Sequence, residues 1–230
     1  MMALTVNQLN GGFPMGRTVA FVLSGCGVKD GSEIHEAVSA LIALDRAGYS
    51  VIFTAPDVQQ ASTVDHSTQE PERHPRNALK EGARIARGNI RPLSELDRDD
   101  YDAVVFPGGF GAALTLCSFA ADGPGCRVNP EVEKLIGDAL RDGKPIAAMC
   151  IAPVIIARTV PGARVTVGND PKTARAIETM GAVHVECSVD EAVVDPERKI
   201  VTTPAYMLAE GPAQVYAGAV RMVQKLDGLF

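Results

Sequence analysis

The sequence predicts a three-layer α/β fold built on a mostly parallel sheet, and three observations support this. A buried strand over Arg17–Ser24, a helix ending at Gly48 and a strand over Tyr49–Thr54 form a β-α-β opening. Such an opening implies a parallel strand pair with a right-handed crossover. Pro145–Ala148 is apolar on both faces, as a central parallel strand is. Pro130–Arg141 has the periodicity of an amphipathic helix, which is suited to covering such a sheet.

The composition is that of an acidic globular protein. The chain has 230 residues, a formal net charge of −6 and a pI near 5.3. A nucleic-acid-binding or anionic-membrane-binding surface is therefore not expected. The longest apolar run, Pro145–Ala157, is too short to cross a bilayer. The five cysteines include no CxxC pair, which is typical of a reducing compartment, so we expect a cytoplasmic protein.

The first sixteen residues differ from the rest of the chain. They carry no charge, and they lack both the apolar core of a signal peptide and the arginines of a transit peptide. We therefore expect a disordered extension over residues 1–16 and a single domain over residues 17–230.

The first half of the chain alternates strands with helices. The first strand ends at Gly25-Cys26-Gly27, and Asp30 or Ser32 is placed to cap the helix that follows. Asp57–Leu96 is polar and interrupted by prolines, which predicts an irregular excursion around one helix. A strand over Tyr101–Phe106 then returns to the sheet. The helix inside the excursion is expected over Asn77–Arg87.

The second half continues the alternation, and Asn129 is placed to cap the helix over Pro130–Arg141. The remaining predicted elements, in chain order, are a helix over Ile151–Arg158 with Pro153 in its first turn, a strand over Arg164–Val167, a helix over Pro171–Met180, a strand over Ala182–Glu186, a hairpin of Ala192–Val194 with Lys199–Thr202, and a last helix from Thr203-Pro204 to about Leu226.

Cys150 lies where the strand Pro145–Ala148 passes into a helix. This turn lifts the side chain above the sheet and points it at a helix N-terminus, whose N–H groups and dipole favour a thiolate. The arrangement is that of a nucleophile elbow, although the flanking glycines of the hydrolase form are missing. The alternative is a buried cysteine that serves only as a small apolar residue.

Two further features are candidates for the partners of such a nucleophile. Gly108-Gly109 follows a parallel strand, where backbone N–H groups can approach a substrate, although an ordinary turn explains the same pair. Glu36 lies on the broad apolar arc of its helix, where burial would raise its pKa toward useful acid–base values. Glu33 instead fits a capping box with Asp30.

Other polar pairs are less convincing. His184 and Glu186 share one face of a predicted strand, and a solvated strand end explains them. Cys26, His35 and Cys150 match no spacing of metal ligands, so neither a metal nor a cofactor is expected.

Four motifs resemble the class I glutamine amidotransferase-like superfamily in its PfpI-type branch, and within it the ElbB-type proteins. These proteins are described as glyoxalases or as isoprenoid-biosynthesis-associated proteins. The motifs are Ser24-Gly-Cys-Gly-Val-Lys-Asp-Gly-Ser-Glu-Ile-His-Glu36, Pro107-Gly-Gly-Phe-Gly-Ala112, Met149-Cys-Ile-Ala-Pro153 and Val201-Thr-Thr-Pro-Ala-Tyr-Met207.

The resemblance implies a flavodoxin-like sandwich, usually dimeric, with Cys150 as nucleophile and Glu36 facing it. It also implies an oxyanion hole made by the backbone N–H groups of Gly109 and Ile151. Two departures argue against glutamine hydrolysis. The His-x-Glu pair of glutaminases is replaced by Thr203-Pro204-Ala205, and Ile151 stands where many PfpI-type members have histidine.

We therefore predict a cofactor-independent glyoxalase III-type lyase that converts glyoxal or methylglyoxal to glycolate or lactate. Gly108, Phe110, Cys26 and Glu33 are expected to border the substrate. Removal of glyoxal adducts from proteins is a near relative of this chemistry. The alternative is a redox-sensing or interaction protein in which Cys150 is oxidised reversibly.

Overall fold

The computed structural model describes residues 16–230, so the extension expected over residues 1–16 lies almost wholly outside it. Seven strands form one sheet in the order β3-β2-β1-β4-β5-β9-β8. All neighbours are parallel except β8 and β9. The strands are β1 (Thr18–Val22), β2 (Ser50–Ala55), β3 (Ile90–Pro92), β4 (Ala103–Phe106), β5 (Ile146–Met149), β8 (Val193–Asp195) and β9 (Ile200–Thr203).

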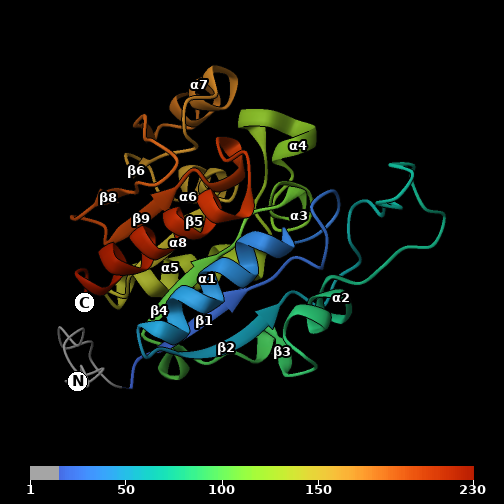
Figure 1. Cartoon of the computed structure of the whole chain (residues 1–230), viewed down its shortest axis with the longest axis horizontal. Helices are drawn as coiled ribbons and strands as arrows, with labels where there is room; N and C mark the ends of the chain where they lie inside the picture. Colours follow the sequence, from blue (N-terminus) through green and yellow to red (C-terminus); the bar gives the residue numbers. More distant parts are fainter. Residues whose placement is uncertain (1–15) are drawn as a thin grey trace, which may run out of the picture.

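Helices cover both faces of this sheet. The longer helices are α1 (Ile34–Arg46), α2 (Ala78–Ile85), α5 (Pro130–Arg141), α6 (Pro153–Thr159), α7 (Pro171–Thr179) and α8 (Pro212–Asp227). In Figure 1, α1 and α8 lie side by side in front of the sheet, and α5 and α6 lie behind it. The flavodoxin-like three-layer sandwich predicted from the sequence is therefore confirmed.

The central strands are apolar on both sides because each side has its own core. Phe21 of β1 packs with the apolar residues of α1 and α8, whereas Val22 packs with those of α5 and α6. Side chains alternate between the two faces of a strand, so a strand covered on both faces must be apolar throughout.

Short elements surround the carboxyl ends of the strands. The helices α3 (Phe110–Leu114) and α4 (Phe119–Asp122) follow β4, the 3₁₀ turn η3 (Gly123–Gly125) follows α4, and η4 (Ala205–Met207) follows β9. Two further 3₁₀ turns, η1 (Leu93–Glu95) and η2 (Arg98–Asp100), precede β4. Within residues 16–230, no helix is both long enough and apolar enough to span a bilayer.

Most predicted elements are present, and the differences are local. The helix over Pro130–Arg141, capped by Asn129, and the hairpin of β8 with β9 are confirmed. The last helix begins at Pro212, not at Thr203, because Ala205 has a φ of 45° and the chain makes only one 3₁₀ turn there. Strands β6 (Arg164–Val165) and β7 (Val183–His184) pair with each other in a separate small sheet. The predicted excursion contains the unpredicted edge strand β3.

Candidate active site

The carboxyl ends of β1, β4, β5 and β9 meet at one edge of the sheet. The strand order reverses between β1 and β4, because the chain runs outward from β1 through β2 and β3 before returning as β4. Open α/β sheets bind ligands at such a switch point. The loops that carry Glu33, Gly109, Cys150 and Tyr206 all begin there.

Cys150 occupies a sharp turn between β5 and α6. Its φ is +61°, a conformation that residues other than glycine rarely adopt. The turn is held in place because the Cys150 N–H donates a hydrogen bond of 3.0 Å to the Thr203 carbonyl at the end of β9. Pro153 is the first residue of α6, where its missing N–H is not needed. The predicted nucleophile elbow is therefore present, and the Cys150 side chain lies nearly buried at the edge of the sheet.

Glu36 reaches Cys150 from α1. The glutamate is completely buried, and its Oε1 accepts a hydrogen bond of 3.1 Å from the Tyr206 N–H. Its other oxygen, Oε2, has no hydrogen-bond partner among residues 16–230 and is buried beside Cys150, where both groups lie against Gly108. Glu36 therefore lies on the apolar face of α1 that packs on the sheet, as its position on the apolar arc of the helix predicted.

Burial dominates the electrostatics of this pair. It raises the pKa of Glu36 from 4.5 to about 8, although the Tyr206 N–H favours the carboxylate. Burial and the adjacent Glu36 also raise the pKa of Cys150 well above its ordinary value. The backbone N–H groups of Gly109 and Ile151 favour the thiolate and oppose this rise in the pKa of Cys150. The expected low pKa for Cys150 is therefore wrong, because the helix end is outweighed by desolvation and a neighbouring acid.

Gly108 lies directly against the Cys150–Glu36 pair. A Cβ added at this residue would lie 2.4 Å from Cys150 Cβ and 2.4 Å from Glu36 Oε2. At Gly109, whose φ is +97°, a Cβ would lie 2.4 Å from the Glu33 nitrogen. Close packing therefore requires glycine at both positions.

We expect Gly108→Ala to lower turnover at Cys150 by roughly tenfold or more, because its methyl group would separate the thiol from the carboxyl group. Gly137→Ala on α5 is the matched control, since a Cβ there has no atom within 4 Å. Steady-state kinetics on both variants test this. Equal turnover in the two variants would show that the contact between Cys150 and Glu36 is not needed.

Glu33 caps α1 differently from the prediction. Its own side chain is the N-cap and accepts a hydrogen bond of 2.7 Å from the Glu36 N–H. Its backbone N–H donates to the Gly108 carbonyl at 2.9 Å. The predicted capping box with Asp30 is therefore wrong, and Glu33 connects the start of α1 to the glycine turn after β4.

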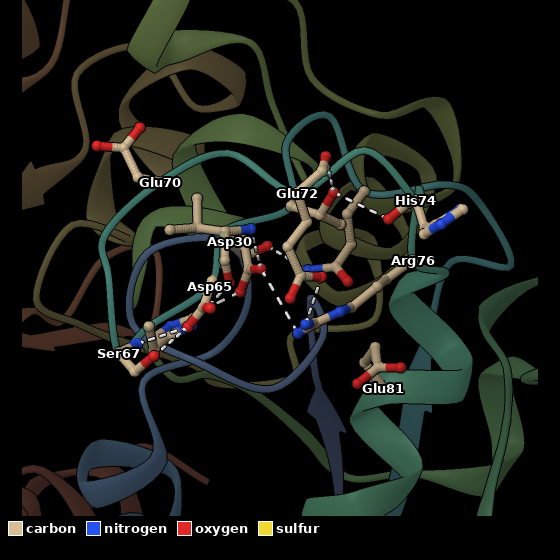
Figure 2. A network of polar contacts seen from close by, with 12 residues as sticks. Asp30, Asp65, Ser67, Glu70, Glu72, His74, Arg76 and Glu81 are labelled. Atoms are coloured by element: carbon tan, nitrogen blue, oxygen red, sulfur yellow. Dashed lines mark hydrogen bonds and ion pairs between the residues drawn. The ribbon is translucent and has the colours of Figure 1, made fainter.

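Asp30 instead anchors the excursion between β2 and α2. Its buried carboxylate accepts a hydrogen bond of 2.9 Å from the Val64 N–H and lies 3.9 Å from Arg76. Arg76 in turn pairs with Glu72 at 2.6 Å, and Figure 2 shows this chain of contacts around Asp30. The network holds the excursion against the loop that leads into Glu33.

A cavity of about 840 Å³ opens above Cys150. Four of the predicted site residues besides Cys150 line it, namely Glu33, Gly109, Phe110 and Ile151. Glu36 and Gly108 lie beneath them against Cys150. Cys26, which was predicted to border the substrate, does not line this cavity. Its thiol lies instead near Glu81 and Arg84 at α2.

The sequence reasoning missed most of the cavity wall. Five regions of the chain form this wall: the loop before α1, the helix α3, the segment of α4 with η3, the helix α7, and η4. The lining residues that were not predicted are Val28, Ala113, Phe119, Ala120, Ala121, Gly123, Pro124, Lys172, Thr173, Arg175, Ala176, Thr179, Tyr206 and Met207. Tyr206 and Met207 belong to the motif Val201–Met207, so for these two residues the sequence did offer a signal. The Tyr206 hydroxyl makes a hydrogen bond of 2.7 Å with His35 Nδ1.

His184 lies away from this site. Its ring accepts a weak hydrogen bond of 3.4 Å from the Val167 N–H beside the small β6–β7 sheet, and it does not line the cavity. In the part of the chain that the structure describes, no three His, Cys, Asp or Glu side chains are grouped as metal ligands.

Similar proteins match nearly the whole chain. The chain is 47% identical over 218 residues to "glutamine amidotransferase-like class 1 domain-containing protein 3, mitochondrial" from Homo sapiens, covering 90% of this chain and 81% of the relative. It is 46% identical over 218 residues to "ES1 protein homolog, mitochondrial" from Rattus norvegicus, covering 90% and 82%. The crystal structure of an isoprenoid biosynthesis protein with an amidotransferase-like domain from Ehrlichia chaffeensis matches with a TM-score of 0.86 and 32% identity, covering 93% of this chain and all of that one.

The expected cytoplasmic location is contradicted by these relatives. Both the human and the rat proteins are mitochondrial. Charge and cysteine content, on which the expectation was based, do not separate one reducing compartment from another.

Residues 26–207 match the DJ-1/PfpI family, and this span contains Glu36, Gly109 and Cys150. The match agrees with the resemblance to the PfpI-type branch of the amidotransferase-like superfamily. This chain belongs to the DJ-1/PfpI family.

Proposed function

We propose that the protein is a cofactor-independent glyoxalase that converts a 2-oxoaldehyde to a 2-hydroxy acid. The buried contact between Cys150 and Glu36, beneath the N–H groups of Gly109 and Ile151, is the observation that supports it most directly. A nucleophile, a proton carrier and two donors for a developing oxyanion are the groups that this reaction requires.

The proposed reaction begins when Cys150 adds to the aldehyde carbon while Glu36 accepts the thiol proton and passes it to the aldehyde oxygen, which returns Glu36 to its carboxylate form. The new S–C bond gives a hemithioacetal, whose oxygen lies against the N–H groups of Gly109 and Ile151. Glu36 then moves a proton from this carbon to the neighbouring carbonyl carbon through an enediol. The aldehyde carbon is oxidised to a thioester as its neighbour is reduced to an alcohol. Water hydrolyses the thioester, releasing the hydroxy acid and the free thiol, so no external oxidant or reductant is needed.

The reaction is tested by following methylglyoxal with purified protein and measuring lactate by NMR across a range of pH. The carboxylate form of Glu36 is the active form, and its pKa is raised to about 8. Turnover should therefore rise about tenfold per pH unit below this pKa and level off above it. Absence of lactate, or a rate that is flat from acid to alkaline pH, would exclude the mechanism.

Glutamine hydrolysis is not proposed despite the names of the relatives. Among residues 16–230, no histidine lines the cavity, and Glu36 occupies the position beside the nucleophile. The turn after β9 carries Thr203-Pro204-Ala205, which provides no imidazole base.

The redox alternative uses the same cysteine. Peroxide reacts with the thiolate form of cysteine. Because only 8% of Cys150 is exposed and its pKa is raised, we expect slow oxidation of this thiol. A rate constant for peroxide that exceeds the one for methylglyoxal would favour a sensor over an enzyme.

We also propose that two copies of the chain pair through α1. Ile34, Val38 and Ile42 are spaced along one face of α1, and their exposed fractions are 44%, 42% and 45%. An uncharged apolar stripe is complementary to itself, as the symmetric interface of a homodimer requires.

Ile42→Glu should convert a dimer to a monomer because it places two carboxylates in the interface, and light scattering measures the molar mass. Val183→Glu is the matched control, since Val183 is 46% exposed on β7. A monomeric parent protein, or an Ile42→Glu variant that stays dimeric, would contradict the proposal.

A further inference from the structure

The cavity above Cys150 is much larger than glyoxal or methylglyoxal. Its volume of about 840 Å³ lies within the range of roughly 300–1,000 Å³ that is typical of pockets for drug-sized ligands. Much of its wall is apolar and includes Phe110, Phe119, Pro124, Ile151 and Met207. A three-carbon dicarbonyl bound at Cys150 would leave most of this apolar surface in contact with water.

Charged groups border the cavity on two different elements. Glu33 lines it from the start of α1, whose residue Glu36 contacts Cys150. Lys172 and Arg175 line it from α7, a helix that packs beside η3 at the top of the view in Figure 1. Within residues 16–230, neither cation has a carboxylate within 4.0 Å. Both lie near enough to Asp170 to lower its pKa, but they remain available to a ligand.

We propose that the substrate is an amphipathic carbonyl compound, with a reactive aldehyde at one end, an apolar chain in the middle and an anionic group at the other end. Glu33 disfavours an anion at the Cys150 end, whereas Lys172 and Arg175 attract one to α7. The apolar chain then lies against Phe110, Phe119 and Met207 between them. This inference rests on the proposed reaction at Cys150 and specifies its substrate class.

Binding is tested separately from turnover by isothermal titration calorimetry with three probes. Decanoate has an apolar chain and an anionic group, decanol has only the chain, and acetate has only the anion. Decanoate should bind roughly tenfold more tightly than decanol, and acetate should show no binding. Equal affinities for decanoate and decanol, or no binding of decanoate, would overturn the proposal.

Variants locate the two ends of the ligand. In the double variant Lys172→Ala/Arg175→Ala, the affinity for decanoate should fall to that for decanol, while decanol binding is unchanged. Lys80→Ala/Arg73→Ala is the matched control, because both residues are exposed and lie outside the cavity. Ala176→Trp, which fills the cavity, should abolish binding of both probes. Undiminished decanoate binding in the double variant, or in Ala176→Trp, would also overturn the proposal.

Turnover distinguishes this inference from the proposed reaction. A 2-oxoaldehyde with a long chain and a terminal carboxylate should have a kcat/KM roughly a hundredfold above that of methylglyoxal. If decanoate binds as described but neither aldehyde is converted, the reaction at Cys150 is wrong and the ligand class stands. If methylglyoxal is converted and decanoate does not bind, the reaction stands and the ligand class is wrong.

Discussion

Cys150→Ala is expected to abolish conversion of methylglyoxal, a loss of roughly 10⁴-fold or more, because none of the other cysteines in residues 16–230 lines the cavity and could replace it as nucleophile. The fold should survive, since alanine is smaller and the elbow is held by the backbone hydrogen bond between Cys150 and Thr203. Steady-state kinetics measure the loss, and circular dichroism measures the fold.

Two variants control for this loss. Cys126→Ala removes a buried thiol that lies outside the cavity, and His184→Ala removes the other base that the sequence offers. Both should keep turnover within a few-fold of the parent protein. If His184→Ala loses as much activity as Cys150→Ala, the general base is His184 and its assignment to Glu36 is wrong.

Glu36→Gln is expected to lower turnover by roughly a hundredfold or more, because it removes the proton carrier and keeps the shape of the side chain. The amide oxygen can still accept the hydrogen bond from the Tyr206 N–H. The rise of activity toward pH 8 should disappear in this variant, since that rise is assigned to the carboxyl group of Glu36.

The same substitution should stabilise the protein at alkaline pH. In the folded protein the pKa of Glu36 is about 8, against 4.5 for an exposed glutamate, so the parent loses stability as pH rises through this window. The loss corresponds to about 1.4 kcal/mol per pKa unit, and the glutamine side chain of the variant does not ionise. Thermal unfolding at acid and alkaline pH measures the difference. A variant that is no more stable than the parent above pH 8 would contradict the raised pKa.

Glu33→Gln distinguishes the role of Glu33 from that of Glu36 at the start of α1. Glu33 is the N-cap of α1, so its substitution should lower the free energy of unfolding by about 1 kcal/mol and leave most of the turnover. If Glu33→Gln abolished turnover while Glu36→Gln kept it, the two roles would have to be exchanged.

The sequence by itself determined the layered fold, the cysteine elbow and the place of Glu36 on the buried face of its helix, and each of these follows from a local pattern. That Glu36 faces Cys150 was implied by the resemblance to the PfpI-type branch. The apolar run before Cys150 and Pro153 after it specify a strand that turns into a helix, and the apolar arc of α1 specifies that Glu36 faces the sheet. Periodicity and caps act over a few residues, so they can be identified in the chain without knowing what packs against it.

Only the tertiary structure decided the direction in which the pKa values of Cys150 and Glu36 are shifted, the size of the cavity and the position of Cys26. The pKa values of Cys150 and Glu36 depend on burial by segments distant in sequence, which no local pattern reports. The cavity wall joins α4 to α7, two helices that are far apart in the chain, and Lys172 and Arg175 gave no signal in the sequence. Cys26 lies in the loop that the sequence singled out, but its thiol lies near Glu81 and Arg84 of α2 and outside the cavity, which depends on how α2 packs against that loop.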